Sequence, residues 1–422
     1  MLKKLIPKSE FSRNVLTLMT GTTIAQAIII AISPILTRLY SPEDFGVYAF
    51  FTAITSIFGS IANGRYELAI MLPKKDEDAI NITALGFIIN VSLSLFLLFV
   101  IIIFHDVILD LLNNKEISPW LYFVPISVFL MGCFNLLNYF NNRKKYYKDL
   151  AKANVYKSIG AAVVQLVFGF LKAGAIGLVS GQIFSQFFAN TKLLKNILKE
   201  RILISKIKKI KMIALAKKYI NHPKYLTFSH GMSTIYLQIP TFFITKFYDL
   251  TTLGFYSFAN RIVSLPGSLI ASSIGDVFRQ RATEDYHKYK RFDRIFLKTF
   301  FATVKISLLP FIIIYFIVED LFAFVFGEHW RIAGIYAKIL IISEFFSFII
   351  TPVDKAALIV NNIGYILRWH IWRFIFYFFW SILSFLIKAD IKIYLYGIVC
   401  INIFFYLIDF YFEYKFSKGE QI

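Results

Sequence analysis

Charged residues and cysteines are scarce in this chain. Charged residues make up 17% of its 422 positions, whereas about a quarter is usual for a soluble globular protein. Hydrophobic residues account for 57%. The two cysteines, Cys133 and Cys400, both lie in apolar stretches, which excludes a disulfide framework and a cysteine-based metal site. This composition indicates an integral membrane protein.

Motifs of enzymes and metal sites are missing as well. The sequence has no Walker A loop, no GxSxG, no HExxH and no dinucleotide-binding fingerprint after a strand. Its six histidines do not have the spacing of metal ligands. We therefore expect no enzyme activity, no cofactor and no metal ion. Without an ATP site, any transport would use an ion gradient or the gradient of the substrate itself.

Apolar stretches long enough to cross a membrane recur along the whole chain. A span needs roughly 20 apolar residues, because the hydrocarbon core is about 30 Å thick. Twelve stretches qualify, and they predict an all-α integral membrane protein of about 12 transmembrane helices. They cover residues 14–37, 45–71, 79–104, 119–140, 153–171, 174–198, 224–245, 253–278, 295–317, 332–351, 364–387 and 392–414.

The basic residues are placed asymmetrically around these spans. If the N-terminus is cytoplasmic, 33 of the 46 Lys and Arg residues fall in cytoplasmic segments, seven in outer segments and six within spans. Such an imbalance follows the positive-inside rule. It predicts a multi-pass protein with an even number of spans and with both termini in the cytoplasm.

A short sequence motif occurs twice, about half the chain length apart. Residues 37–48 read TRLYSPEDFGVY and residues 245–256 read TKFYDLTTLGFY. The shared positions are Thr37 and Thr245, Tyr40 and Tyr248, Gly46 and Gly254, and Tyr48 and Tyr256, with the cations Arg38 and Lys246 also in register. Each copy ends one apolar stretch and opens the next. The repeat predicts two similar helical bundles around a shared site, as in many transporters.

A basic segment separates the two halves. We expect an N-terminal six-helix bundle over 1–198, a basic cytoplasmic linker over 199–223 and a C-terminal six-helix bundle over 224–422. The linker contains KIKKIKMIALAKK, which favours an amphipathic helix whose lysines meet anionic lipid headgroups. Because the segment is tethered between two spans, we do not expect it to bind nucleic acid.

Four cations lie deep within predicted spans and are candidates for substrate binding. They are Arg65, Arg261, Lys305 and Arg373. A cation near mid-bilayer costs about 2.5–3.5 kcal/mol on insertion scales, so it should face a cavity or a partner. A cavity lined by Arg and Lys suits an anion, above all a diphosphate. Glu67 is two positions from Arg65, so on a continuous helix the two would not share a face.

Acidic residues and helix-bending residues also occur within the spans. Glu67, Asp276 and Glu344 are candidates for coupling to a proton or to sodium, and the alternative is that each pairs with a nearby cation. The candidate hinges are Pro34, Pro240, Pro266 and Gly267, with an inert kink as the alternative.

Two stretches near the N-terminus resemble a known family. They are LTRLYSPEDFGVYAFFTAI at 36–54 and GRYELAIMLPKKDEDA at 64–79. Both resemble the opening of the Wzx-type polysaccharide flippases, of the multidrug/oligosaccharidyl-lipid/polysaccharide exporter superfamily. The stretch GFYSFANRIVSLPGSLIASSIGDVF at 254–278 is similar to the equivalent element of the second half.

The resemblance implies two six-helix lobes around a central cationic cavity in the bacterial cytoplasmic membrane. It implies translocation of an undecaprenyl-diphosphate-linked oligosaccharide for O-antigen or another surface polysaccharide, and a polymerase and chain-length complex as partners. Arg65 and Arg261 match positions where related proteins carry cations, and Arg38 and Lys246 would lie near the outer gate.

Other functions remain open at this point. A drug or organic-cation antiporter of the same superfamily would favour acidic cavity residues. A lipid II flippase commonly has an additional pair of spans. A glycosyl polymerase or ligase generally carries a large outer loop, whereas the longest outer loops expected here are 105–118 and 318–331. A scaffold of the assembly complex is a further alternative.

Overall fold

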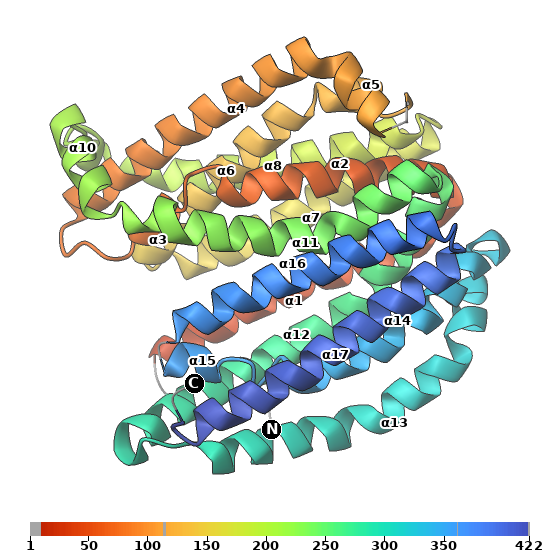
Figure 1. Ribbon diagram of the computed structural model, residues 1–422. Helices are drawn as coiled ribbons and strands as arrows, with labels where there is room; N and C mark the ends of the chain where they lie inside the picture. The colour runs from red at the N-terminus through yellow and green to blue at the C-terminus, as the bar shows by residue number, and fades with distance from the viewer. Residues whose placement is uncertain (1–9, 113–114, 361, 421–422) are drawn as a thin grey trace, which may run out of the picture. The chain divides into compact units, whose positions relative to one another are not determined.

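The computed structural model describes the backbone of residues 10–112, 115–360 and 362–420, and this part of the chain is helical without strands (Figure 1). The longer helices are α1 (Glu10–Leu39), α2 (Pro42–Ile61), α4 (Asp76–Leu112), α6 (Val124–Arg143), α7 (Tyr147–Phe170), α8 (Ala175–Lys199), α10 (Lys209–Lys218), α11 (Phe228–Phe247), α12 (Leu250–Tyr289), α13 (Asp293–Phe326), α14 (Arg331–Ile350), α16 (Ile363–Leu386) and α17 (Ile391–Ser417). Single-turn elements are α3 (Tyr66–Ala69), α5 (Ser118–Leu121), α9 (Arg201–Ile204), η2 (His222–Thr227), η3 (Glu328–Trp330) and α15 (Ala356–Ile359).

The expected all-α membrane fold is confirmed. Apart from α10, each of the longer helices has 20 or more residues and coincides with one of the twelve predicted spans. In the described part, nine helical segments are long and apolar enough to cross a membrane by length and composition. The other three, α8, α11 and α12, carry more polar residues, so hydropathy alone does not select them.

The chain divides into two compact units, Met1–Ile235 and Tyr236–Ile422, with the division inside α11. The first unit contains α1, α2, α4, α6, α7 and α8, and the second contains most of α11 together with α12, α13, α14, α16 and α17. The predicted linker at 199–223 holds α9 and α10. The predicted boundaries at 198 and 224 stay predictions.

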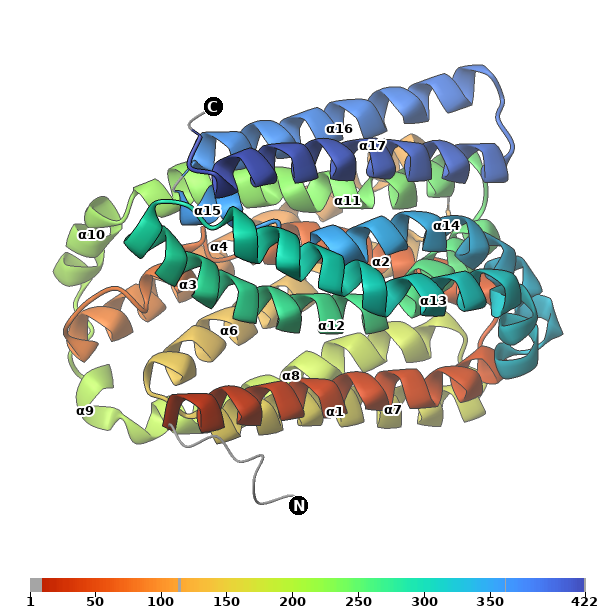
Figure 2. The same cartoon turned by 90° about the horizontal axis from the view of Figure 1, so that it is seen from below.

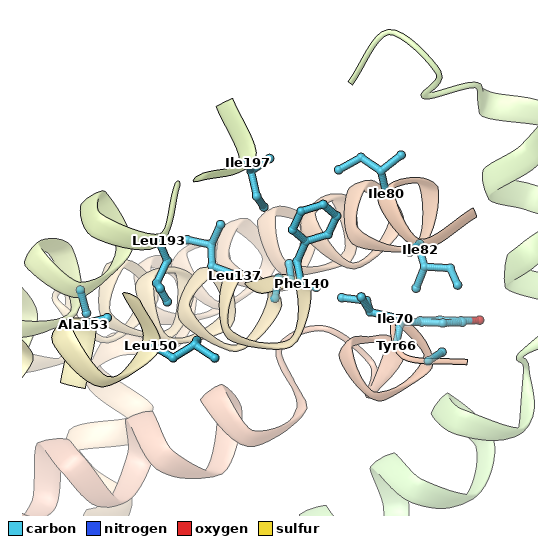
Figure 3. Close-up of a cluster of buried hydrophobic side chains, with 14 of the residues drawn as sticks. Tyr66, Ile70, Ile80, Ile82, Leu137, Phe140, Leu150, Ala153, Leu193 and Ile197 are labelled. Carbon is cyan, nitrogen blue, oxygen red and sulfur yellow. The ribbon is translucent and has the colours of Figure 1, made fainter. Parts of the chain in front are cut away.

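In the first unit α7 packs along both α1 and α8, and α6 packs on α4 and α8 (Figure 2). Buried apolar side chains from these helices meet in a cluster at the end that carries α3 and α10 (Figure 3). Ile82, Phe140 and Leu193 are fully buried there. In a bilayer such contacts stabilise helix association through close packing, because lipid tails are as apolar as the side chains.

In the second unit α14 is the central helix, in contact with α12, α13 and α17. The core at one end is built mainly of phenylalanine. Phe278, Phe292 and Phe296 are buried together, and Phe410 packs against Phe296 with ring centroids 5.6 Å apart. Aromatic edge-to-face and tilted pairs of this kind add directional contacts to the packing.

The repeated motif forms the same structure twice. In each unit a long helix ends and a polar N-cap residue starts the next helix: Ser41 caps α2 and Asp249 caps α12 through the backbone N–H of the third helical residue. In each unit a tyrosine of the motif donates a hydrogen bond to a backbone carbonyl far away in the sequence. Tyr40 donates to the Gln165 carbonyl, and Tyr248 donates to the Ala389 carbonyl over 2.7 Å.

The second predicted span is not one helix, which corrects the expectation for 45–71. α2 ends at Ile61, and the backbone turns through Gly64 and Arg65 at φ of 57° and 59° before the single turn α3. A left-handed backbone conformation costs little free energy at Gly64, which has no Cβ, and is unfavourable at Arg65. Arg65 therefore lies at a break in the helix instead of on a continuous helical face.

The two longest expected outer loops are largely helical, which is a second correction. α4 continues to Leu112, with a kink at Phe104 where φ is −106° and ψ is 19°. α13 continues to Phe326. These extensions are apolar, so hydropathy could have included them, but the acidic residues within them favoured a loop.

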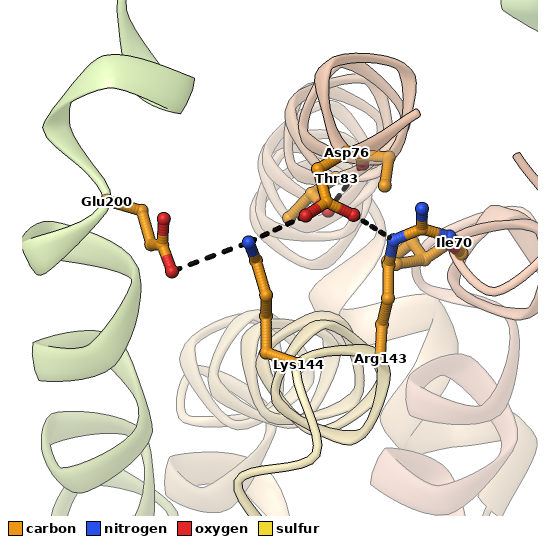
Figure 4. A network of polar contacts seen from close by, with 7 residues as sticks. Ile70, Asp76, Thr83, Arg143, Lys144 and Glu200 are labelled. Carbon is orange, nitrogen blue, oxygen red and sulfur yellow. Dashed lines mark hydrogen bonds and ion pairs between the residues drawn. The ribbon is translucent and has the colours of Figure 1, made fainter. Parts of the chain in front are cut away.

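Polar contacts fasten one end of the first unit (Figure 4). Asp76, at the start of α4, accepts from Arg143 Nε at 2.8 Å and from Lys144 Nζ at 2.7 Å. Lys144 also lies 3.5 Å from a carboxylate oxygen of Glu200. The network joins the ends of α4, α6 and α8, so it fixes the helix ends beside α3.

Candidate functional site

Arg65 and Glu67 form an ion pair at the break between α2 and α3. Arg65 Nη1 lies 3.2 Å from Glu67 Oε1, and the side chains are 18% and 2% exposed. The pairing corrects the argument from helical spacing, because the left-handed backbone at Arg65 removes the two residues from a common helix. Of the predicted cations deep in spans, Arg65 alone has a carboxylate partner among the described residues.

The Arg65–Glu67 pair is incompletely satisfied. Arg65 Nε, Glu67 Oε2 and Asn63 Oδ1 are buried without a hydrogen-bond partner among the described residues. Asn63 is held in place by a hydrogen bond from its Nδ2 to the Gly132 carbonyl at 3.1 Å. Buried polar atoms without partners are costly, so this cluster is a place where a polar ligand would recover hydrogen bonds.

Glu67 lies in the segment between two candidate spans, outside both. Burial raises the pKa of its carboxyl, and the positive charge of Arg65 partly opposes that shift. The charge balance of this cluster is therefore sensitive to protonation of Glu67.

Arg373 is buried in a ring of aromatic side chains in the second unit. Its guanidinium carbon lies 5.1 Å from the ring centroid of Tyr236, 5.2 Å from Tyr406 and 5.8 Å from Trp369. Arg373 Nη2 donates to Asn402 Oδ1 at 2.5 Å. Cation–π contacts of desolvated arginines are worth about 2 kcal/mol or more, so the ring partly replaces water around the charge.

The Arg373 guanidinium has no carboxylate within ion-pair distance in the described part of the chain. Its Nε has no hydrogen-bond partner among the described residues. Asn402 Oδ1 also accepts from the Tyr377 hydroxyl at 2.6 Å. A buried cation held only by neutral groups has the chemistry of an anion-binding site.

Sequence reasoning missed the residues that surround Arg373. Tyr236 lies on α11, Tyr377 on α16, and Asn402 and Tyr406 on α17. The only local signal was the four-residue spacing of Arg373 with Tyr377 and of Asn402 with Tyr406, which places each pair on one helix face. The meeting of three helices at this point needed the tertiary structure.

The other two predicted cations are not joined to these clusters. Arg261 is half-buried on α12, and Lys305 is exposed on α13; neither forms an ion pair or hydrogen bond with another described residue. The residues one turn away from Lys305, Phe301 and Leu309, are exposed apolar side chains. Roles of Arg261 and Lys305 in substrate binding stay predictions.

The remaining acidic candidates differ in environment. Asp276 is exposed on α12 and lies 3.3 Å from Arg279, one turn along the helix. Glu344 is half-buried on α14 and has no ion pair or hydrogen bond with another described residue. Asp276 therefore pairs with a nearby cation, which is the alternative to a coupling role. Glu344 has no such cation partner among the described residues. A coupling role stays a prediction for both.

The gate candidates are exposed near helix ends, and the hinge candidates lie inside helices. Arg38 is exposed and donates to the Pro34 carbonyl at 2.6 Å, and Lys246 is exposed with its Nζ 5.6 Å from the Phe247 ring centroid. Pro34 lies inside α1 and Pro240 inside α11. Pro266 and Gly267 lie inside α12, although the side chain of Pro266 is outside the described part. Gating and hinge roles stay predictions.

No group of three or more His, Cys, Asp or Glu side chains in the described part is arranged to hold a metal ion. The chemistry available in both clusters is therefore binding of an anion by guanidinium groups, with proton exchange at Glu67. Neither cluster pairs a nucleophile with a base.

Comparison with known proteins places these observations in a family. The sequence profile of the family described as "Polysaccharide biosynthesis protein" matches residues 35–333. The chain belongs to this family. A curated relative, the "Succinoglycan biosynthesis transport protein ExoT" of Rhizobium meliloti (strain 1021), is 21% identical over 349 residues. That match covers 78% of this chain and 65% of the relative, so the chain spans less than two thirds of the relative's length.

Solved structures of membrane transporters share the fold. The lipid II flippase MurJ in an inward closed conformation superimposes with a TM-score of 0.69 at 16% identity, over 94% of this chain and 89% of that one. An outward-facing multidrug resistance transporter of the MATE family and MOP superfamily gives a TM-score of 0.64 at 14% identity, over 97% of both chains. The fold is that of the MOP superfamily. The chain is a multi-pass membrane protein of a polysaccharide biosynthesis family.

Proposed function

We propose that this family member is a flippase for undecaprenyl-diphosphate-linked oligosaccharides in the bacterial cytoplasmic membrane. It moves repeat units of O-antigen or another surface polysaccharide between leaflets by alternating access. Both termini face the cytoplasm in this proposal, as the charge asymmetry predicts. Membership of a polysaccharide biosynthesis family and the transporter fold support it.

The observation that carries the proposal is the buried guanidinium of Arg373, which forms no ion pair with a described carboxylate. A permanent positive charge inside a membrane-spanning helix is costly unless an anion neutralises it, and the described residues supply no carboxylate partner. A diphosphate offers several acceptor oxygens to a guanidinium. In the first unit, considered by itself, the exposed part of Arg65 is another candidate for binding an anion.

Glu67 gives the proposed cycle a proton-sensitive step. When ionised, its carboxylate neutralises Arg65 and competes with an anionic substrate. When protonated, it releases the guanidinium. Proton coupling through Glu67 is thereby part of the proposal, and sodium coupling is the alternative to be tested beside it.

Flipping in proteoliposomes tests the proposal. Purified protein would be reconstituted with a fluorescent lipid-linked oligosaccharide, and transfer between leaflets would be followed by quenching from outside. We expect transfer by the wild type, at least tenfold slower transfer by Arg373→Ala, and partial recovery in Arg373→Lys. Arg294→Ala is the matched control, because Arg294 is exposed in the first turn of α13 and has no partner among the described residues.

An antiporter for organic cations is the second candidate. The unpaired carboxyl of Glu344 favours it, since a half-buried acid suits a cationic substrate. If the wild type exports cationic dyes under an imposed proton gradient and moves no lipid-linked glycan, the flippase proposal is wrong. A wild type that flips the glycan at the same rate as Arg373→Ala would contradict the role of Arg373 alone.

A further inference from the structure

An apolar groove runs along the side of the first unit, on α4, α6 and α8. Its volume is about 530 Å³, and its lining is almost wholly hydrocarbon. Ile80 and Ile88 mark its extent on α4, Phe129 and Leu137 on α6, and Phe187 and Ile197 on α8. The groove is separate from Arg65 and Glu67, neither of which lines it.

The length of the groove matches one leaflet of a bilayer. Ten residues separate Phe187 from Ile197, which corresponds to about 15 Å along a helix. Half of a hydrocarbon core of about 30 Å has the same depth. The groove therefore has the dimensions to hold one acyl chain that runs parallel to the helices within a single leaflet.

The groove ends at the basic segment that contains α9 and α10, which is fastened to α4. The Asn81 side chain donates to the Lys206 carbonyl at 3.1 Å and accepts from the Lys208 N–H at 2.8 Å. Glu77 lies 3.0 Å from Lys211 Nζ. Ile207 and Met212 of this segment line the end of the groove, so its position relative to the groove is fixed by hydrogen bonds.

A second apolar groove lies on the other side of Met212, with a volume of about 560 Å³. It shares Ile88 and Met212 with the first groove, and its lining includes Lys209 and Lys217. Both lysines are exposed, and neither has an ion pair or hydrogen bond with another described residue. Lys206 and Lys211, in contrast, lie near Glu77.

We propose that these two grooves bind one anionic glycerophospholipid. One acyl chain lies in each groove, on either side of Met212, and the headgroup phosphate lies over α10 beside Lys209 and Lys217. The apolar linings of the two grooves suit the two acyl chains. The two unpaired ammonium groups account for the negative headgroup, because basic residues at a membrane surface attract anionic lipids. This proposal does not depend on the transported substrate.

Native mass spectrometry of the delipidated full-length protein tests it. The protein would be given equal amounts of phosphatidylglycerol and phosphatidylcholine in detergent, and retained lipid would be counted. We expect preferential retention of one phosphatidylglycerol. Lys209→Ala/Lys217→Ala should lower its retention about tenfold. The control Lys218→Ala/Lys224→Ala removes the same charge from the same segment, where the lysines stack on Tyr219 and Tyr225.

A second pair of variants tests the groove itself. Ala84→Phe places a ring in the groove that Ala84 lines, and it should lower lipid retention. Ala214→Phe adds the same ring on the exposed side of α10 and should not. Equal retention of both lipids, or wild-type retention by the double lysine variant, would overturn the proposal. Displacement of phosphatidylglycerol by a polyprenyl diphosphate would also overturn it, since the groove would then belong to the substrate.

Discussion

At the scale of single residues, Arg65 and Arg373 differ in what surrounds their charge. Arg65 is neutralised by an acid two positions away, which the break in the helix brings within 3.2 Å. Arg373 is surrounded by neutral rings and an amide. The first charge can be switched by protonating one carboxyl, whereas the second is permanent. We therefore expect pH to act through Arg65 and not through Arg373.

Glu67→Gln should remove a pH dependence of flipping. Burial raises the pKa of Glu67, so its carboxyl is neutral below that raised pKa and ionised above it. In the wild type, flipping should rise as pH falls, because the neutral form frees Arg65. The variant should flip at a rate that does not change over the same range.

Rates in proteoliposomes at equal pH on both sides would check this expectation. Glu200→Gln is the control, since Glu200 is an acid of the same unit that contacts Lys144 and forms no ion pair with Arg65. An unchanged slope of rate against pH in Glu67→Gln would contradict a role for this carboxyl.

At the scale of elements, the repeated corner is fixed in each unit by one tyrosine hydroxyl. Tyr40 is 3% exposed, and its hydroxyl reaches a backbone carbonyl on α7, while Tyr248 reaches the Ala389 carbonyl between α16 and α17. Buried carbonyls that lose a donor are costly. The two tyrosines of the motif therefore have a structural role in both units.

Tyr40→Phe should lower the stability by about 1–3 kcal/mol, the cost of an unsatisfied buried partner. Tyr248→Phe should lower it less, because the contact of Tyr248 with Ala389 is only part-buried. The midpoint of thermal unfolding in detergent would show the loss. Tyr396→Phe is the control, because Tyr396 is exposed and has no hydrogen bond to another described residue. A loss of the same size in Tyr396→Phe would contradict the assignment to the hydroxyl contacts.

Asn81→Ala should loosen the segment that contains α9 and α10. The substitution removes both hydrogen bonds between the Asn81 side chain and the backbone of Lys206 and Lys208. Hydrogen exchange of peptides from 201–218 should then be faster. Asn135→Ala, which removes one long hydrogen bond of 3.4 Å to the Gly59 carbonyl, should leave that exchange unchanged.

At the scale of the whole molecule, two helical units with similar corners make up the transporter fold. The distribution of Lys and Arg predicts the orientation of these helices in the membrane. By the positive-inside rule we expect the α10 end in the cytoplasm and the loop before α17 outside.

Single cysteines that replace Lys208 or Lys388 should be accessible to a thiol reagent from opposite sides of the membrane. In a background with Cys133→Ala and Cys400→Ala, Lys388→Cys should react with an impermeant maleimide added to intact cells. Lys208→Cys should react only after the membrane is opened. The reverse pattern would contradict the predicted topology, and total labelling after solubilisation would control for expression.

Much of the architecture was predictable because its signals are local. Apolar stretches of about 20 residues, together with the placement of basic residues between them, predicted the twelve helices, although α8, α11 and α12 are more polar than the others. The repeat at 37–48 and 245–256 indicated two related units. Arg65 and Arg373 were found as costly charges within apolar stretches. The break at Gly64 and Arg65 was missed, because the surrounding residues are apolar enough to continue a helix. The partners of Arg373 were missed because they come from three helices.

The sequence by itself determined the class of protein, the helices and the residues that carry charge into them, since these depend on composition along short stretches of chain. The tertiary structure decided which groups meet. It paired Arg65 with Glu67 by turning the backbone, enclosed Arg373 in rings from α11, α16 and α17, and fastened α10 to α4 beside an apolar groove. These contacts join positions distant in sequence or reoriented by a left-handed turn, so no local pattern encodes them.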